Sequence, residues 1–374
     1  GEASSPTRLL GEASSPLTPF SFLLSPFSFL LSPFSFLLIF TLPMPSVKSI
    51  WFSAFRKRYE RRALKDFIKA SGQQIIFPFY HTVSNDDLPH IKHLYRWRNV
   101  QEFESDMDFL LRNFTPLHYD DLINKRYQEN TPYFHLSFDD GLSELYHIIR
   151  PILIEKGIPA TLFINDAFVD NHDLMYRYKV SLLIEHFTKQ SLLKCLNVLG
   201  KNKLNSANDP VQFLKQINYS EIPLVNSIAE HLGFDFSDYL RLHKPYLELS
   251  QLETMASEGF TIGAHSVDHP NFSDIDAASQ HDQVKLSVDY VRNTFNISNP
   301  AFAFPFSADG ADAALLQNMQ SAYKISRSFG TAGLKRNTVE NHIDRIPAEY
   351  LNWPLESIVK AEYHYYLAKK MIGK

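Results

Sequence analysis

The sequence of 374 residues predicts an α/β fold with parallel strands, on three observations. Short apolar runs alternate with helix-patterned segments along most of the chain. Several of these runs are followed at once by polar residues, as is common at the carboxyl ends of parallel strands. The composition, 44% hydrophobic and 21% charged, supplies enough apolar side chains for a large core. A disordered or collagen-like chain is thereby excluded.

Predicted strands and helices alternate over residues 74–164. Phe103, Met107 and Leu111 recur at a spacing of four, which predicts a helix over residues 101–113 with its apolar side inward. A second helix is predicted over residues 145–155. The apolar runs that predict strands lie at residues 74–79, 133–138 and 160–164.

The alternation lapses between about residues 170 and 245. Residues 174–199 and 211–242 have helical spacing, whereas residues 200–210 are polar and resemble a loop. We therefore expect a helical insertion over about 170–245.

After this segment the strand–helix order returns. Ser250 and Glu253 are predicted to form a capping box at the start of a helix that ends at Gly259. Further strands are expected at residues 260–264, 300–306 and 323–328, with helices between them at residues 277–295 and 311–322.

Charge and cysteine content narrow the functional classes. Lys and Arg total 37 against 41 for Asp and Glu, so the overall charge gives no reason to expect a nucleic-acid partner. The single Cys195 excludes an intrachain disulfide and a site of several thiolates. Any metal must therefore be held by His, Asp or Glu.

Residues 1–43 differ from the rest. They contain repeats such as Ser-Pro-Phe-Ser-Phe-Leu-Leu, and residues 17–47 carry no charge over a length that could span a bilayer. We expect the repeats to lie outside the functional protein, with translation starting at Met44. A secretory signal and a membrane anchor are the alternatives.

Residues 44–70 form a basic segment. Ile50, Trp51, Phe55 and Tyr59 lie among its cations, so the segment is amphipathic and is either an interfacial helix or a surface helix of the domain. Membrane contact through residues 17–65 therefore stays open. With a start at Met44 we expect a cytoplasmic protein or one peripheral on the inner membrane face; a membrane-anchored or extracytoplasmic location is the alternative.

Two clusters at predicted strand ends can carry chemistry, at residues 137–141 and 265–270. Loops after parallel strands converge on one face of a fold, so the two clusters can meet. His265, His269 and one aspartate would hold a divalent metal with positions open for water and substrate. The neighbouring aspartate would then accept a proton from water.

These residues resemble the polysaccharide deacetylase family, also called the NodB-homology domain. Ser-Phe-Asp-Asp-Gly at 137–141 and His-Ser-Val-Asp-His-Pro at 265–270 match its first two motifs, and the similarity covers about 75–345 without the insertion. The resemblance implies a distorted (β/α) barrel and metal-dependent removal of acetyl groups from N-acetylated sugars. It implies Asp139 as the general base and Asp140, His265 and His269 as ligands of one divalent ion, with zinc expected and cobalt, nickel or manganese as alternatives.

The third family motif is altered. Its arginine is absent from Ala-Phe-Pro-Phe-Ser at 303–307, which resembles the branch that contains poly-N-acetylglucosamine deacetylases. In that branch the general acid comes from a Tyr-His motif, here Tyr80 and His81. Arg345 is a candidate for the missing cation that orients the base, and a surface ion pair is the alternative for it.

The resemblance also implies a substrate region. A backbone N–H near Phe306 would stabilise the oxyanion, and Pro305 and Tyr80 are expected beside the substrate. We expect an acetylated glycan as the substrate, and nothing in the sequence indicates an obligate protein partner. A non-catalytic carbohydrate-binding relic and an O-acetyl esterase are the rival functions. Sugar-stacking candidates, most of which are expected in the core, are Trp97, Tyr176, Tyr178 and Trp353.

Overall fold

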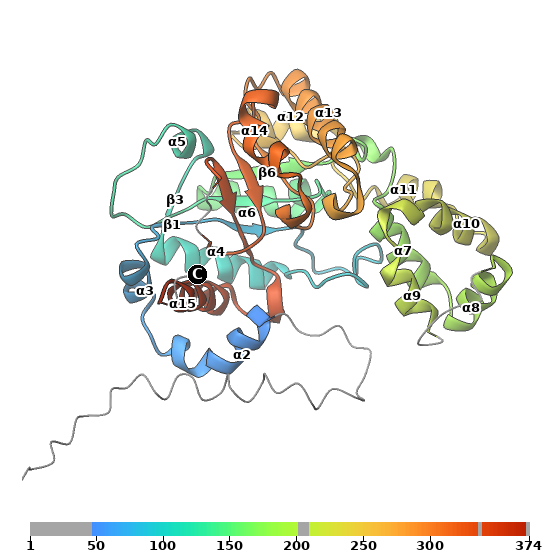
Figure 1. Cartoon of the computed structure of the whole chain (residues 1–374), viewed down its shortest axis with the longest axis horizontal. Helices are drawn as coiled ribbons and strands as arrows, with labels where there is room; N and C mark the ends of the chain where they lie inside the picture. The colour runs from blue at the N-terminus through green and yellow to red at the C-terminus, as the bar shows by residue number, and fades with distance from the viewer. Residues whose placement is uncertain (1–46, 201–208, 336–338, 372–374) are drawn as a thin grey trace, which may run out of the picture. The chain divides into compact units, whose positions relative to one another are not determined.

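The computed structural model describes residues 47–200, 209–335 and 339–371 (Figure 1). The repeats predicted at residues 1–43 lie outside these ranges, and so do residues 201–208 of the polar segment in the insertion. Among the helices in the described ranges, none is both long and apolar enough to cross a membrane.

Parallel strands form the main sheet, eight of them within the described residues. Their order across the sheet is β10-β9-β8-β7-β6-β5-β2-β11, and every pairing is parallel. The strands are β2 (Pro78–Tyr80), β5 (Leu136–Phe138), β6 (Ala160–Ile164), β7 (Thr261–Ala264), β8 (Phe302–Ala303), β9 (Ser328–Gly330), β10 (His342–Asp344) and β11 (Ile346–Pro347).

The two edge strands of this sheet are consecutive in the chain, with only Arg345 between them. β10 pairs with β9, whereas β11 pairs with β2 at the opposite edge. The backbone N–H of Arg345 donates to the carbonyl of Gly330 at 3.1 Å, and that of Ile346 donates to Phe77 at 2.8 Å. The chain therefore crosses from one edge to the other at Arg345, and the sheet nearly closes into the expected distorted (β/α) barrel.

A second parallel sheet consists of β1 (Ile75–Ile76), β4 (Tyr133–Phe134) and β3 (Thr115–Pro116), in the order β1-β4-β3. The runs predicted as single strands at 74–79 and 133–138 are therefore each divided between two sheets. His135 stands at one break, where its ring nitrogens hydrogen-bond to the Leu117 carbonyl and the Thr161 hydroxyl, both at 2.8 Å. A buried polar ring is thus satisfied where the strand is interrupted.

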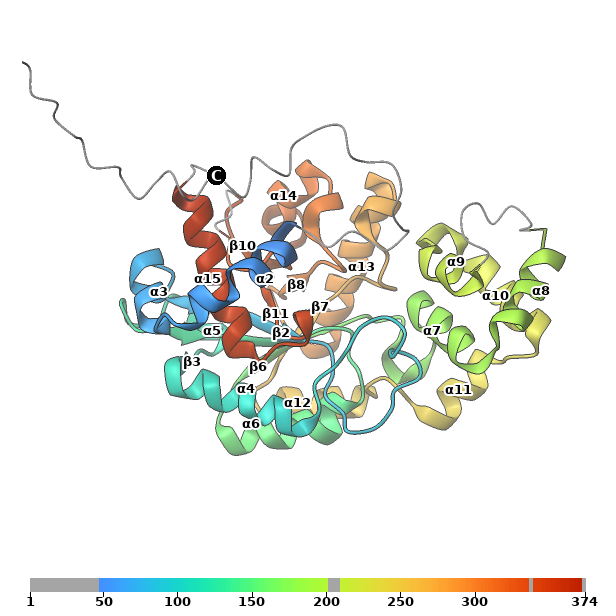
Figure 2. The ribbon, with the colours of Figure 1, turned by 90° about the horizontal axis from the view of Figure 1, so that it is seen from below.

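Helices surround the barrel (Figures 1 and 2). α13 begins after Asp276, whose side chain accepts from the N–H of Ser279, and it ends at Asn296 in the left-handed conformation. The helices are α4 (Val100–Asn113), α5 (Tyr119–Ile123), α6 (Arg150–Lys156, after a π-helical turn at Leu145–Ile149), α12 (Leu249–Ser257), α13 (Ala277–Phe295), α14 (Ala313–Tyr323) and α15 (Leu355–Met371).

Two local predictions are wrong. α12 begins at Leu249, so its capping box is formed by Glu248 and Gln251; Ser250 and Glu253 lie inside the helix instead. The strand expected at 323–328 is β9 at residues 328–330, because α14 extends to Tyr323 and ends where Lys324 turns left-handed. The apolar pattern predicts that an element exists more reliably than it predicts where that element begins and ends.

α2 (Val47–Glu60) and α3 (Leu64–Ser71) pack against α15 (Figure 2). Phe52 and Tyr59 of α2 are fully buried, and Lys48 forms an ion pair with Glu362 at 2.5 Å. Trp51 donates from its indole N–H to His364 of α15 at 3.1 Å. The domain therefore covers one side of α2, which makes it a surface helix. Its exposed residues are Ile50, Ser53, Ala54, Lys57, Arg58 and Glu60.

The insertion contains helices that form a cluster beside the barrel (Figure 1). Val180, Leu192, Leu214 and Ile228 belong to a buried core within this cluster. A second buried group joins the insertion to loops that follow β5 and β6, and includes Tyr178, Leu142 and Phe168. The helices are α7 (Tyr176–His186), α8 (Lys189–Val198), α9 (Pro210–Gln216), α10 (Ile222–Leu232) and α11 (Phe236–His243).

Candidate metal centre and active site

The barrel brings the two predicted motif clusters together at the carboxyl ends of its strands. Asp139 and Asp140 follow β5, and His265 follows β7, two strands away in the sheet. His269 lies in the loop that continues from His265. One ligand atom from each of Asp140, His265 and His269 lies within 4.8 Å of the others, and all three residues are buried.

Hydrogen bonds fix the orientation of this cluster. Nδ1 of His265 lies 2.9 Å from the carbonyl of Ala303, which can only accept, so Nδ1 carries the proton and Nε2 presents a lone pair. His265 Nε2 lies 3.5 Å from Asp140 Oδ1, and His269 Nε2 lies 3.2 Å from the same oxygen. Burial lowers the pKa of His265 to about 4, despite the opposing charge of Asp139, so its ring is neutral at neutral pH.

Asp140 is held by a residue of the insertion. The hydroxyl of Tyr178 donates to Asp140 Oδ2 at 2.7 Å, and the Tyr95 hydroxyl lies 3.0 Å from that of Tyr178. Asp140 Oδ1 is buried without a hydrogen-bond partner among the described residues. Burial raises the pKa of Asp140, but the charge of the adjacent His269, together with those of His81 and His265, outweighs it and holds the pKa far below its ordinary value.

This donor set fits a divalent cation. A buried carboxylate oxygen without a partner is costly, and a bound cation removes that cost. The two imidazoles and one carboxylate are the mixed nitrogen and oxygen ligands that catalytic zinc and related ions use while keeping open positions.

Asp139 is oriented by Arg345, the residue between β10 and β11 where the barrel closes. Arg345 Nη1 and Nη2 donate to the two oxygens of Asp139 at 2.6 and 2.8 Å, in a bidentate pair. The Arg345 side chain is fully buried, and its guanidinium lies over the ring of Phe79, 4.3 Å from the centroid. The alternative of a surface ion pair is therefore wrong for Arg345.

The ion pair with Arg345 also keeps Asp139, the candidate general base, ionised. Burial alone raises the pKa of the Asp139 carboxyl, but the charge of Arg345, with His265 and His81, lowers the pKa below its ordinary value. Asp139 is thus a carboxylate at neutral pH. Its Oδ2 lies 3.9 Å from Nε2 of His265, next to the ligand cluster.

His81 follows β2 and lines a pocket together with Asp139 and Asp140. Its Nδ1 lies 2.6 Å from Glu349 Oε2, so the ring donates to this carboxylate, and its backbone N–H donates to Glu349 Oε1 at 3.2 Å. Burial lowers the pKa of His81, but the charge and hydrogen bond of Glu349, together with Asp140 and Asp139, more than offset this and raise the pKa to about 9. His81 is therefore protonated at neutral pH.

The loops that hold these residues adopt uncommon backbone angles. Asp140, Ser266, His269 and Phe306 are non-glycine residues with positive φ, between 56° and 71°. Gly141 also has a φ of 67°, and a Cβ there would lie 3.2 Å from Cγ2 of Ile164. Such conformations gather where a fold constrains a site, and here they turn the chain sharply after β5, β7 and β8.

Of the three predicted substrate residues, one lines the pocket over the ligand cluster and two do not. Phe306 lines the pocket, with its ring 4.6 Å from the ring of His269. Tyr80 does not: its side chain is fully buried and its hydroxyl donates to Asp106 at 3.0 Å, because alternation along β2 directs it into the core. That prediction is wrong. Pro305 is likewise outside the residues that line the pocket, although it precedes Phe306.

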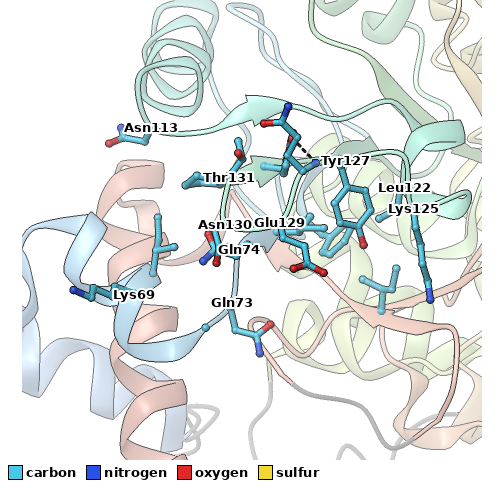
Figure 3. A pocket seen from close by; sticks show the side chains of 18 of the residues that line it. Lys69, Gln73, Gln74, Asn113, Leu122, Lys125, Tyr127, Glu129, Asn130 and Thr131 are labelled. Carbon is cyan, nitrogen blue, oxygen red and sulfur yellow. Dashed lines mark hydrogen bonds between the residues drawn. The ribbon is translucent and has the colours of Figure 1, made fainter.

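A pocket of about 640 Å³ opens over the cluster. Besides the residues above, the insertion lines it with Met175, Arg177 and Lys215. A larger pocket, of about 1050 Å³, lies at the starts of β1 and β4 and is lined by side chains such as Gln73, Gln74 and Asn130 (Figure 3). None of the ligand candidates lines that larger pocket, so the chemistry belongs to the smaller one.

Sequence patterns did not indicate several functional candidates. Glu349, Arg177 and Lys215 carry no motif that would single them out. Tyr178, a sugar-stacking candidate of a group expected mostly in the core, is fully buried, and its hydroxyl donates to Asp140. Each of these residues reaches the site through tertiary packing, which local spacing does not reveal.

Comparison with known proteins shows the family of the chain. A family model described as polysaccharide deacetylase matches residues 126–323, more than half of the chain. In structure the chain is similar to the Streptococcus pyogenes deacetylase PplD in complex with acetate, with a TM-score of 0.51 and 15% identity over 78% of this chain and 98% of that chain. IcaB from Ammonifex degensii gives a TM-score of 0.49 and 14% identity over 78% of this chain and 98% of that chain. No curated protein matches the sequence.

Proposed function

The chain belongs to the polysaccharide deacetylase family, and on that premise we propose a metal-dependent hydrolase that removes acetyl groups from N-acetylated sugars of a polysaccharide or glycan precursor. Hydrolases of this family act on carbon–nitrogen bonds other than peptide bonds. One observation carries the proposal: the unpartnered oxygen of Asp140 faces two buried histidines, next to an ionised Asp139.

Asp140, His265 and His269 would hold one divalent ion, for which we propose zinc, with cobalt, nickel or manganese as alternatives. Such an ion polarises the acetyl carbonyl and lowers the pKa of water at the site. The bond to Ala303 orients His265, and the bond from Tyr178 orients Asp140. Of His269 only the backbone N–H is bonded, to the Ser266 hydroxyl, and its buried Nδ1 has no partner among the described residues.

Asp139 would be the general base. Its two oxygens accept from Arg345, which fixes the carboxylate plane and keeps it ionised. As water attacks the acetyl carbonyl, Asp139 takes one proton from it. The ion pair with Arg345 thus does for this chain what the arginine of the third family motif would do elsewhere in the family.

His81 would be the general acid. A nitrogen leaving group must be protonated as the carbon–nitrogen bond breaks, and His81 carries a proton at neutral pH because Glu349 stabilises its charge. The Phe306 backbone N–H, in the loop after β8, is the proposed donor to the oxyanion. Tyr80, His81 and the 303–307 sequence support the branch of poly-N-acetylglucosamine deacetylases for this chemistry.

Acetate release from a matched substrate pair tests this function. Protein that starts at Met44 is given an N-acetylglucosamine oligosaccharide and an O-acetylated sugar. We expect release from the amide, and a loss of about 10² in rate on the amide in His81→Ala. Activity on the ester alone, kept in His81→Ala, would instead indicate an O-acetyl esterase. Sugar binding without release from either substrate would indicate a carbohydrate-binding relic.

A further inference from the structure

Two cations of the insertion line the active-site pocket. Arg177 comes from α7 and Lys215 from the end of α9, and the Arg177 Nη1 donates to the Lys215 carbonyl at 2.6 Å. This bond places both residues on one wall of the pocket. The wall is built from the insertion rather than from the barrel.

Each carboxylate that lines the pocket already has a partner. Asp139 is paired with Arg345, and Glu349 with His81. Asp140 accepts from Tyr178 and faces the two histidines. The pocket therefore holds no carboxylate that is available to the cations of the insertion.

Neither Arg177 nor Lys215 is paired with a carboxylate in the described part of the chain. Arg177 contacts only neutral groups, the Lys215 carbonyl and the Tyr176 hydroxyl at 3.1 Å, and Lys215 Nζ has no partner there. Cations on a pocket wall that have no carboxylate partner attract an anion, and charge-assisted hydrogen bonds to it are strong.

Arg177 lies close to the ligand cluster. The guanidinium of Arg177 is 5.9 Å from the centre of the Phe306 ring, and that ring is 4.6 Å from the ring of His269. A sugar with its acetyl group at the Asp140 cluster would therefore extend its other substituents past Phe306 toward Arg177.

We propose that Arg177 and Lys215 bind an anionic group, a phosphate or a carboxylate, carried by the N-acetylated sugar. This inference rests on the proposed function and narrows its substrate class. Guanidinium groups match the paired oxygens of both anions. The same wall disfavours a polymer that becomes cationic as its acetyl groups are removed, so an anionic glycan or a phosphate-linked glycan precursor fits the pocket better.

Binding of reaction products tests the proposal without turnover. Calorimetry with the metal-loaded enzyme compares glucosamine, glucosamine 1-phosphate and muramic acid, which differ in the anion they carry. We expect one or both anionic sugars to bind about 10- to 100-fold more tightly than glucosamine, as charge-assisted hydrogen bonds do. A preference for one of them identifies the anion as phosphate or carboxylate. Equal affinity for all three would overturn the proposal.

Charge-removing variants locate the preference. Arg177→Gln and Lys215→Gln should each reduce it at least several-fold, and Lys215→Gln removes an ammonium group that supports no other contact. Lys194→Gln is the matched control, because Lys194 is an exposed cation of α8 outside the pocket. An anion preference that survives both pocket variants would place the anion on the metal itself and contradict the proposal.

Turnover separates this inference from the proposed function. In acetate release from N-acetylglucosamine 1-phosphate or N-acetylmuramic acid, Lys215→Gln should raise KM with little change in kcat, whereas the control Lys194→Gln should change neither. Absence of release from every N-acetylated sugar would overturn the proposed function, and the calorimetric comparison would still decide the role of the two cations.

Discussion

The barrel and the insertion build one pocket by different means. The barrel contributes Asp139, Asp140 and His265 from strand ends, where the chain direction and the register fix each side chain. The insertion contributes Tyr178 and Arg177 from a helix that is positioned by its packing on loops and on the other helices of the insertion. Residues of the first kind stand in contiguous motifs, and those of the second kind do not. The barrel therefore supplies the proposed catalytic residues, and the insertion supplies side chains that contact them or line the pocket.

Asp139→Asn should have the largest effect on the barrel side of this comparison. The amide keeps the shape of the carboxylate but cannot accept a proton, so we expect acetate release to fall by about 10³ or more. The metal content per chain should be unchanged, because Asp140, His265 and His269 remain. Near-normal release by this variant would remove Asp139 from the role of base.

Arg345→Met tests the buried ion pair between Arg345 and Asp139. Removal of one partner leaves the buried Asp139 charge uncompensated, so we expect a loss of about 3–5 kcal/mol in the free energy of unfolding, together with lower activity. Denaturant unfolding measures the first effect. Combining Arg345→Met with Asp139→Asn should recover part of that stability, since no unpaired charge remains. A double variant no more stable than Arg345→Met would contradict the account of this pair.

Tyr178→Phe tests the contribution of the insertion to the ligand cluster. Loss of the hydrogen bond to Asp140 Oδ2 should weaken metal binding by about 10- to 100-fold, as measured by competition with a chelator. Tyr239→Phe is the control, because Tyr239 is also a tyrosine of the insertion but its hydroxyl contacts His90. Equal metal affinity in the two variants would show that the insertion does not support the cluster.

Glu349→Gln should give the smallest effect, a shift in pH dependence. Protonated His81 is required as the acid, so activity is present below its pKa of about 9 and is lost as the pH rises through that value. Loss of the Glu349 charge removes the main cause that raises the pKa of His81, so this pKa falls. The alkaline limb of the kcat/KM profile should therefore move to lower pH. An unchanged limb would assign it to another group.

The sequence predicted most of the barrel and the ligand cluster because both depend on local patterns. Asp140, His265 and His269 follow apolar runs that become strands, and strand ends in a parallel sheet converge. The partner of His81 could not be predicted, since Glu349 reaches it only because β11 pairs with β2. The burial of Arg345 was equally hidden, because β10 and β11 are very short strands and lack a strand-like run.

Metal-dependent acetate release tests the central claim most directly. Enzyme that starts at Met44 is treated with a chelator and then given zinc, cobalt, nickel or manganese, with His265→Ala treated in parallel. We predict that acetate release from an N-acetylated sugar disappears on chelation and returns with one equivalent of ion per chain, and that His265→Ala neither binds the ion nor releases acetate. Full activity after removal of the metal, or an active His265→Ala, would contradict the account.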